Sequence, residues 1–173
     1  MEKEKIFNRK RHEHRQDLAG EHALGDLGQI LFLLLFLAAW IIDSFFLKYS
    51  TFISEYIPLY VKIPLSAIIL ICSGYIAKRG LNIVFGETRE EPAVIRKGVF
   101  GVVRHPVYFG SILFYLGLLT LTCSIIAAII CIFIIVFYCF IARHEEKILL
   151  EKFGKDYEEY KKEVPMLIPR IFK

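Results

Sequence analysis

The sequence predicts an all-α, polytopic membrane protein with about four transmembrane helices, the last two of which form a tight hairpin. Three observations lead to this prediction. The chain of 173 residues is 55% hydrophobic and has a mean hydropathy of +0.49. Residues 107–142 contain no Lys, Arg, Asp, Glu or His, and 20 of the 22 Lys and Arg fall in three segments separated by apolar ones. Apolar stretches of about 20 residues are long enough to cross a bilayer.

The first two predicted spans lie within residues 27–77. The first runs over residues 27–47 and is interrupted only by Asp43, which we expect to snorkel to the outer surface. The second and weaker span runs over residues 59–77. It contains Lys62, which we expect to snorkel to the interface. Pro58 and Pro64 suit the first turns of this helix better than its interior.

The hairpin follows from the length of the uncharged stretch 107–142. A single helix of this length would extend about 54 Å, nearly twice the thickness of a hydrocarbon core of about 30 Å. The stretch therefore predicts two antiparallel helices. Small polar residues cluster at 120–124, and we expect the turn there.

The distribution of basic residues predicts the topology. With four spans, residues 1–26, 78–106 and 143–173 all lie on one side, which the positive-inside rule makes cytoplasmic together with both termini. Topology and attraction to anionic membrane lipids explain the net charge of +4, so nothing points to nucleic acid. The four Cys lie in or at the edge of spans without a zinc or CxxC pattern, so we expect no metal site. The sequence sets no oligomeric state, and residues 1–173 are expected to form a single membrane domain.

The two ends of the hairpin carry a dense group of titratable residues. Arg104, His105 and Pro106 open the third span, and residues 143–146 (Arg-His-Glu-Glu) close the fourth. Antiparallel helices bring these ends together, and charged groups that converge at a membrane edge indicate a site. The tail that follows carries an apolar stripe at helical spacing, which predicts an amphipathic helix lying on the membrane or packed on the loop. The stripe consists of Leu149, Phe153, Tyr157, Tyr160 and Val164.

Two motifs in this region resemble a known family. Residues 104–110 (RHPVYFG) resemble the RHPxYxG signature, and residues 145–165 resemble the EE…FGxxYxxYxxxVP tail, of integral membrane methyltransferases. These are the isoprenylcysteine carboxyl methyltransferases and the related phospholipid methyltransferases. The resemblance covers about residues 86–169. It implies a methyltransferase that uses S-adenosyl-L-methionine and acts on a lipophilic or lipidated acceptor from the bilayer.

The resemblance also implies roles for individual residues. Phe100 stands where family members often have Tyr, so it would contact the cofactor by packing. The family's substrate-orienting arginine aligns with Ile141, and the nearest arginine is Arg143. The catalytic candidates are His105, Arg143 and Glu146. The cofactor-binding candidates are Pro92, Ala93, Val94, Ile95, Phe100, His105, Pro106, Val107, Tyr108 and Glu145.

Several alternatives remain open at this stage. Methyl transfer from a sulfonium needs alignment and desolvation more than acid–base groups. Arg143 could clamp a carboxylate acceptor, whereas an amine acceptor in a phospholipid or other lipid would need a base such as His105, His144 or a glutamate. A reductase related to the NADPH-dependent sterol reductases and a non-catalytic membrane scaffold are the rival functions. Arg104 can also be read as a topology anchor, and the Glu pair as a solvated helix start.

Overall fold

A computed structural model describes residues 23–85 and 93–170, and every regular element in this part of the chain is a helix. The long helices are α2 (Ala23–Ile41), α3 (Leu59–Phe85), α4 (Pro106–Thr122) and α5 (Ile125–Phe153), followed by the short α6 (Lys155–Glu163). A π-helical turn, η2 (Ile42–Leu47), extends α2. Two 3-10 turns, η3 (Phe52–Tyr56) and η4 (Gly98–Gly101), lie in the connections.

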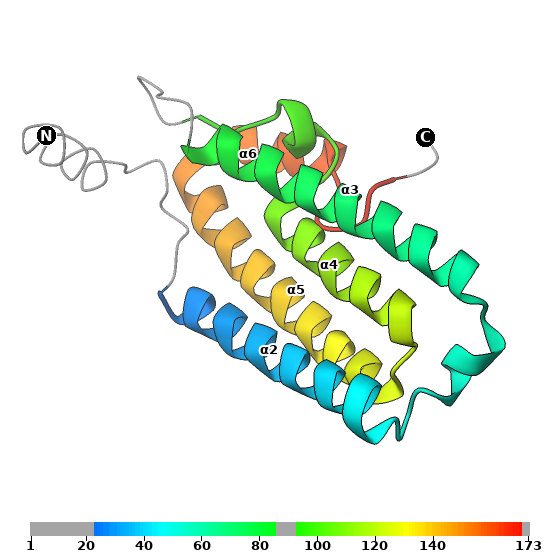
Figure 1. Cartoon of the computed structure of the whole chain (residues 1–173). Helices are drawn as coiled ribbons and strands as arrows, with labels where there is room; N and C mark the ends of the chain where they lie inside the picture. The colour runs from blue at the N-terminus through cyan, green and yellow to red at the C-terminus, as the bar shows by residue number, and fades with distance from the viewer. Residues whose placement is uncertain (1–22, 86–92, 171–173) are drawn as a thin grey trace, which may run out of the picture.

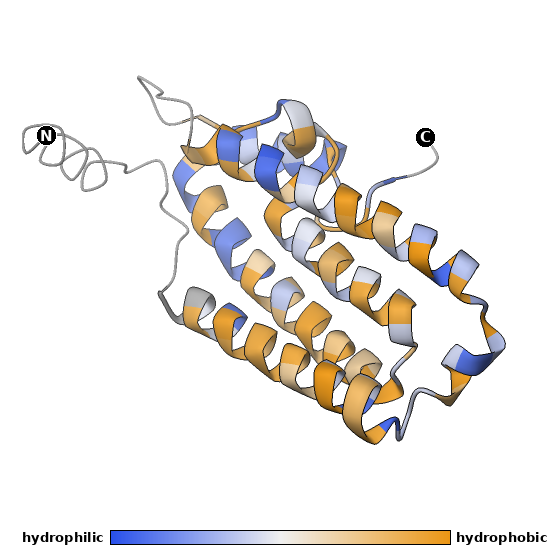
Figure 2. Ribbon diagram, in the orientation of Figure 1, coloured by the Kyte–Doolittle hydropathy of each residue, from blue (hydrophilic) through white to orange (hydrophobic). Residues whose placement is uncertain are grey.

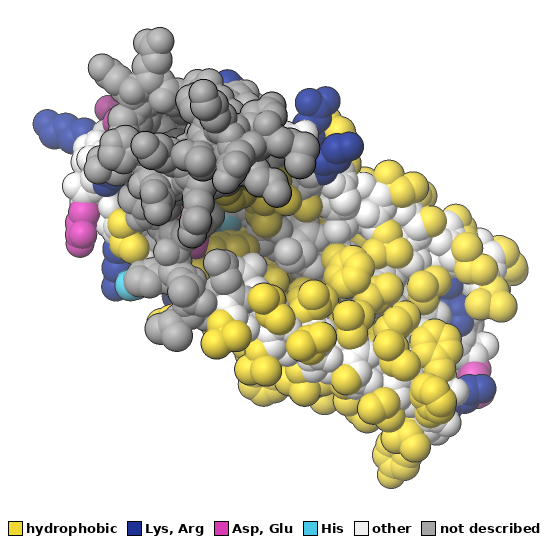
Figure 3. All heavy atoms as spheres, turned by 60° about the vertical axis from the view of Figure 1, so that its left-hand side comes forward, with side chains coloured by type: hydrophobic (Ala, Val, Ile, Leu, Met, Phe, Trp, Pro, Cys, Tyr) yellow, Lys and Arg dark blue, Asp and Glu magenta, His cyan; other side chains and the backbone are white. Residues whose placement is uncertain are grey.

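The predicted all-α membrane fold is confirmed. Residues 27–47, α3 and α5 are long and apolar enough to span a bilayer, and α4 is a shorter apolar helix of 17 residues. The second span is longer than predicted, because α3 continues to Phe85. The hairpin turn lies at Cys123 and Ser124, where Cys123 takes a left-handed backbone conformation with φ of 52°. Apolar side chains cover the helical body, while charged ones lie toward its ends (Figures 2 and 3).

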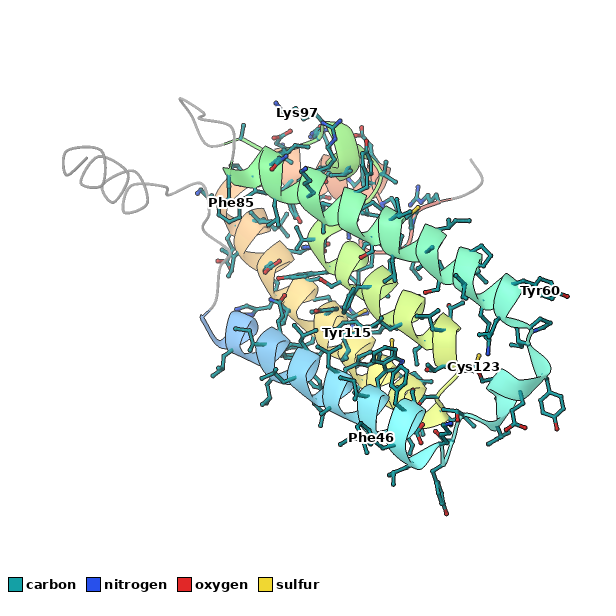
Figure 4. All side chains as sticks on the ribbon, viewed as in Figure 1. Phe46, Tyr60, Phe85, Lys97, Tyr115 and Cys123 are labelled. Atoms are coloured by element: carbon teal, nitrogen blue, oxygen red, sulfur yellow. The ribbon has the colours of Figure 1, made fainter. Side chains whose placement is uncertain are left out.

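The hairpin of α4 and α5 occupies the middle of the bundle (Figure 1). Helix α2 packs on α5 and α3 packs on α4. The core between α2 and the hairpin contains Phe36, which packs edge-on against Tyr115 at 4.7 Å between ring centroids, and Phe32, which lies 4.8 Å from Phe137. Figure 4 labels Phe85 and Lys97 at one end, which we call the loop end, and Phe46 and Cys123 at the opposite end.

Glycines on α4 allow close approach to α3. The Ser66 hydroxyl donates to the Gly117 carbonyl at 2.7 Å, and the Ser73 hydroxyl donates to the Gly110 carbonyl at 2.8 Å. A Cβ atom at Gly110 would lie 3.2 Å from the Ser73 carbonyl oxygen and 3.1 Å from the Cβ of Ala77. Small residues at such crossings let helix backbones pack tightly in a membrane. This contact fixes α3 beside the start of α4.

Asp43 does not snorkel to the surface as the sequence suggested. Its side chain is 2% exposed, and its carboxylate accepts hydrogen bonds from the Ser50 and Ser124 hydroxyls, each at 2.5 Å. The backbone N–H groups of Tyr49 and Ser50 donate to the other oxygen. Because Ser124 caps the N-terminus of α5 and Ser50 accepts from Ile126, the carboxylate ties α2 to the hairpin turn.

Lys62 is buried as well. The residue is 5% exposed, and its ammonium donates to the carbonyl and hydroxyl oxygens of Ser54, at 2.8 and 2.5 Å. The lysine therefore ties the start of α3 to η3. Hydrogen bonds to residues in the adjoining connections pair the charged groups of both Asp43 and Lys62, so neither group needs a water molecule as its partner.

Candidate functional site

The structure brings the titratable residues of the two motifs together at the loop end. His105 precedes the first turn of α4, and the glutamate pair lies in the last turns of α5. The imidazole Nδ1 of His105 lies 3.3 Å from Glu145 Oε2, and its Nε2 lies 3.4 Å from Glu146 Oε1. The Tyr108 hydroxyl donates to Glu145. One histidine thus bridges both carboxylates.

Glu146 is the more buried and more heavily paired of the two carboxylates. It is 4% exposed, and its Oε1 accepts from the Nε and the second terminal nitrogen of Arg104, both at 2.7 Å. The ammonium of Lys161, on α6, lies 3.1 Å from Oε2. The Arg104 guanidinium also donates to the backbone carbonyls of Lys161 and Val164. Glu146 and Arg104 therefore hold the end of α6 against the hairpin.

The C-terminal tail and the preceding loop form one cover over this end of the bundle. Gly154, with φ of 55°, separates α5 from α6 and turns the chain back. The backbone N–H of Arg104 donates to the Pro165 carbonyl at 2.9 Å, and the Tyr160 hydroxyl donates to the Phe100 carbonyl at 2.6 Å. Of the predicted apolar stripe, Tyr157, Tyr160 and Val164 are buried and pack with Val94, Leu149 and Phe153. The tail helix thus packs on the loop, which is one of its two predicted positions.

The electrostatics of the site favour a protonated His105. Burial to 8% exposure opposes the charged form, but hydrogen bonds and charge from Glu145 and Glu146 outweigh it. The pKa of His105 is therefore raised above its ordinary value. A cationic imidazole between two carboxylates holds both in fixed positions.

Glu145 keeps capacity for a ligand that Glu146 lacks. Its side chain is 18% exposed, against 5% for Glu146. Each of its oxygens has one partner, from Tyr108 or His105, and a carboxylate oxygen accepts two hydrogen bonds. The first turn of α4 begins beside it at Pro106 and carries the positive end of that helix's dipole. Glu145 can therefore accept from an ammonium group, while the helix start favours an anion.

A column of stacked rings runs from this site into the bundle. The rings of His105 and Tyr108 are 5.6 Å apart with 9° between their planes, and those of Tyr108 and Tyr138 are 5.2 Å apart with 6° between their planes. Tyr138 lines a groove of about 430 Å³ formed by α2, α3, α4 and α5. The groove includes Leu33 and Leu37 of α2 and Ala77 of α3. Tyr115, labelled in Figure 4, lies in its wall.

The remaining predicted site residues are more dispersed. Pro92 lies outside the described residues. Ala93 is exposed, whereas Ile95 and Phe100 are half-buried in the loop, and Pro106 is buried at the start of α4. Arg143 is exposed on α5 and takes no part in the contacts of the Glu145–Glu146 group given above.

Sequence reasoning missed Lys161 and the polar wall of the groove. Ser111, Tyr115 and Tyr138 resemble ordinary core or interfacial residues when read in an apolar hairpin. The available signal was spacing, because Ser111 and Tyr115 are four residues apart and share a helix face.

Comparisons with known proteins place this arrangement in a family. Residues 61–156 match the family model for phospholipid methyltransferases. The chain is 30% identical over 150 residues to a methanethiol S-methyltransferase from Crocosphaera subtropica, an alignment covering 85% of this chain and 49% of that protein. It is 31% identical over 93 residues to a protein-S-isoprenylcysteine O-methyltransferase from Schizosaccharomyces pombe, covering 52% of this chain and 39% of that protein. These alignments span less than half of the relatives' own length.

The fold has a counterpart among solved structures. The structure of a eukaryotic intramembrane Ras methyltransferase, an isoprenylcysteine carboxyl methyltransferase, superposes with a TM-score of 0.54 at 19% identity, over 87% of this chain and 54% of that chain. With its apolar helices, the protein is a multi-pass integral membrane protein. Because the family model covers more than half of the sequence, the chain belongs to the phospholipid methyltransferase family.

Proposed function

We propose that this protein is an integral membrane methyltransferase that moves a methyl group from S-adenosyl-L-methionine to a lipophilic acceptor. The observation that carries the proposal is the direct connection between a charged site at the loop end and an apolar groove inside the bundle. His105 and Tyr108 belong to the charged site, and Tyr138, stacked on Tyr108, belongs to the groove. A polar donor and an apolar acceptor need such a junction in order to meet.

The residues at the loop end fit the chemistry of the donor. S-adenosyl-L-methionine, when bound, supplies a methyl group on a sulfonium and carries an ammonium, a carboxylate and an adenine. Glu145 would accept from the ammonium, and the start of α4 would hold the carboxylate. Val94, Ile95 and Phe100 offer apolar surface for the adenine. Holding donor and acceptor in line and excluding water accounts for a large share of such a reaction's rate.

The charged residues that pair with one another hold this site in position. Arg104 and Glu146 hold α6 in place, and the protonated His105 orients Glu145. We therefore assign Glu146 a positioning role in place of the catalytic role suggested by the sequence. His105 contacts both carboxylates, which raises its pKa and favours the charged form over the neutral form that a base requires.

The acceptor is proposed to reach the groove from the bilayer, between α2 and α3. Residues of both helices line the groove together with residues of α4 and α5. The two helices lie on opposite sides of the hairpin (Figure 1). The curated relatives are named for different acceptors, methanethiol and isoprenylcysteine, so family membership alone leaves the acceptor open. We further propose that the loop end faces the cytoplasm, since the described segments 93–106 and 143–170 at that end are rich in Lys and Arg, whereas Lys48 and Lys62 alone lie between the first two spans.

Binding of the donor tests this proposal. Calorimetry on the purified full chain in lipid nanodiscs should detect S-adenosyl-L-methionine and no comparable affinity for NADPH. Glu145→Gln should weaken donor binding, whereas Glu151→Gln, an exposed glutamate on the same helix, should leave it unchanged. A folded sample that binds NADPH, or neither compound, would refute the assignment.

A further inference from the structure

The loop that precedes α4 is fastened to one face of α6. Asp156, Tyr160 and Glu163 are spaced by four and three residues, so their side chains share a face of this helix. The Arg96 guanidinium donates to the Asp156 carboxylate at 2.5 Å, to the Asp156 carbonyl at 2.7 Å and to the Glu163 carboxylate at 3.3 Å. Its central carbon lies 5.8 Å from the centroid of the Tyr160 ring. One loop residue thus contacts all three residues of this face.

Two further contacts attach the same loop to α6. The Tyr160 hydroxyl donates to the Phe100 carbonyl at 2.6 Å, four residues beyond Arg96. Val94, two residues before Arg96, packs against the buried cluster that contains Tyr160. The loop residues proposed to pack on the adenine, Val94, Ile95 and Phe100, therefore alternate with points at which the loop is held to α6.

Helix α6 is also held to the hairpin that carries the glutamate pair. The Lys161 ammonium lies 3.1 Å from Glu146, and Arg104 joins Glu146 to the Lys161 carbonyl. Glu145, proposed to accept from the donor's ammonium, is the neighbour of Glu146. Helix α6 therefore links the two halves of the proposed donor site: the loop beside the adenine and the hairpin end beside the amino-acid group.

The contacts of Arg96 lie close to solvent. The side chains of Arg96, Asp156 and Glu163 are 34%, 57% and 65% exposed. Exposed ion pairs contribute little to the stability of a fold, and salt screens them. The planar guanidinium nevertheless binds several acceptors in a fixed geometry, which a flexible ammonium does not reproduce. Arg96 is therefore suited to fix the position of the loop more than to stabilise the whole fold.

We infer, on the basis of the proposed methyltransferase function, that Arg96 is a positioning residue for the nucleoside half of the donor. It holds residues 94–100 against α6, so that the apolar loop side chains are already in place when the adenine arrives. A loop ordered before binding loses less conformational entropy on binding, which raises affinity. Arg96 acts through the loop, and Glu145 acts on the amino-acid half, so the two residues support separate parts of one ligand.

Two ligands test this division. S-adenosyl-L-methionine carries both halves, whereas 5′-methylthioadenosine carries the nucleoside and a thioether, lacks the amino-acid group and is uncharged at neutral pH. Calorimetry on the full chain in nanodiscs gives the affinity for the first ligand, and displacement of that ligand gives the affinity for the second. Arg96→Gln should weaken both by the same factor, about 3- to 10-fold, where tenfold corresponds to about 1.4 kcal/mol. Glu145→Gln should weaken only S-adenosyl-L-methionine.

Salt adds a measurement that a general loss of stability would not change. Because 5′-methylthioadenosine is uncharged, the salt dependence of its affinity reports on charges within the protein. The parent should bind it several-fold more weakly at about 1 M KCl, where the Debye length is about 3 Å, than at about 0.01 M, where it is about 30 Å. Arg96→Gln should bind it equally at both concentrations. Lys162→Gln, which removes an exposed ion pair with Glu158 within α6, should behave as the parent.

Two more variants examine the partners and the geometry. Asp156→Asn should weaken 5′-methylthioadenosine binding as well, and its combination with Arg96→Gln should be less than additive, as expected for residues in one network. Arg96→Lys keeps the charge without the planar fork and should recover only part of the affinity. SDS titration establishes that each variant is folded.

The outcomes distinguish the role of Arg96 from the proposed function. Unchanged 5′-methylthioadenosine affinity in Arg96→Gln, an Arg96→Gln protein that is unfolded where the parent is folded, or a parent whose bound S-adenosyl-L-methionine is not displaced by 5′-methylthioadenosine would each overturn the positioning role and leave the methyltransferase standing. A folded parent that binds no S-adenosyl-L-methionine refutes the methyltransferase function itself.

Discussion

Adjacent glutamates at the end of α5 should respond differently to the same substitution. Glu146→Gln removes the charge that pairs with Arg104 and Lys161, whereas Glu145→Gln removes the charge that faces His105 and, in our proposal, the donor's ammonium. Both changes keep the size of the side chain. The comparison therefore separates the structural role of one carboxylate from the ligand-binding role of its neighbour.

The structure sets the expected magnitudes. Removing one partner of a buried ion pair costs roughly 3–5 kcal/mol. Glutamine still accepts one hydrogen bond from Arg104, and Lys161 is 35% exposed and adds little, so we expect about 3 kcal/mol for Glu146→Gln. Glu145→Gln should cost only about 1 kcal/mol of stability, because neutral hydrogen bonds remain. It should weaken donor binding by about 10- to 150-fold, corresponding to a charged hydrogen bond of roughly 1.5–3 kcal/mol.

Two measurements distinguish the roles of Glu145 and Glu146. Unfolding in SDS titrations gives the stability of each variant, and calorimetry gives the dissociation constant for S-adenosyl-L-methionine on the folded protein. Equal loss of donor affinity in both variants, or a Glu146→Gln protein as stable as the parent, would refute the division of roles. A stable Glu146→Gln protein with normal donor affinity and no turnover would instead restore the catalytic role.

Three other predictions concern single sites. Folding raises the pKa of His105, so the contribution of this histidine to stability is complete below the ordinary histidine pKa and is lost as pH rises through the higher pKa of the folded state. The apparent Tm should therefore fall as pH rises between these two pKa values, and His105→Gln should make this fall smaller. Asp43→Asn weakens charge-assisted hydrogen bonds from two hydroxyls and two amides and should cost about 2 kcal/mol in an SDS titration; unchanged stability would contradict the network. Gly110→Ala should destabilise the α3–α4 contact by about 1–3 kcal/mol, whereas Gly74→Ala, in open space, should stabilise its helix by about 0.5 kcal/mol. Changes in stability of the same sign in both variants would contradict the close packing at Gly110.

Patterns extended over many residues were the most predictable from the sequence. The uncharged stretch 107–142 was too long for one span, and this arithmetic was enough to predict the hairpin. Helical spacing likewise predicted the apolar stripe from Leu149 to Val164. Both signals depend on periodicity and length, which a chain reveals without knowledge of its contacts. The meeting of residues 104–106 with residues 143–146 then followed from antiparallel geometry.

Individual polar residues were less predictable, because their partners are set by tertiary structure. Asp43 and Lys62 were expected at the surface by the general cost of burying charge. In the fold, Ser124, 81 residues further along, donates to Asp43, and Ser54 accepts from Lys62. The same limitation hid the groove, since Tyr138 becomes distinctive only when it stacks on Tyr108 and lines the groove with Ser111.

Transfer of a labelled methyl group would show the proposed activity itself. The full chain in nanodiscs would be incubated with a membrane lipid extract and isotopically labelled S-adenosyl-L-methionine, and the extract analysed by mass spectrometry. We expect a lipophilic product that carries the label, is absent without the protein, and falls sharply with Glu145→Gln but persists with Glu151→Gln. A folded protein that leaves the label entirely in the donor, or labels the extract equally well as Glu145→Gln, would contradict it.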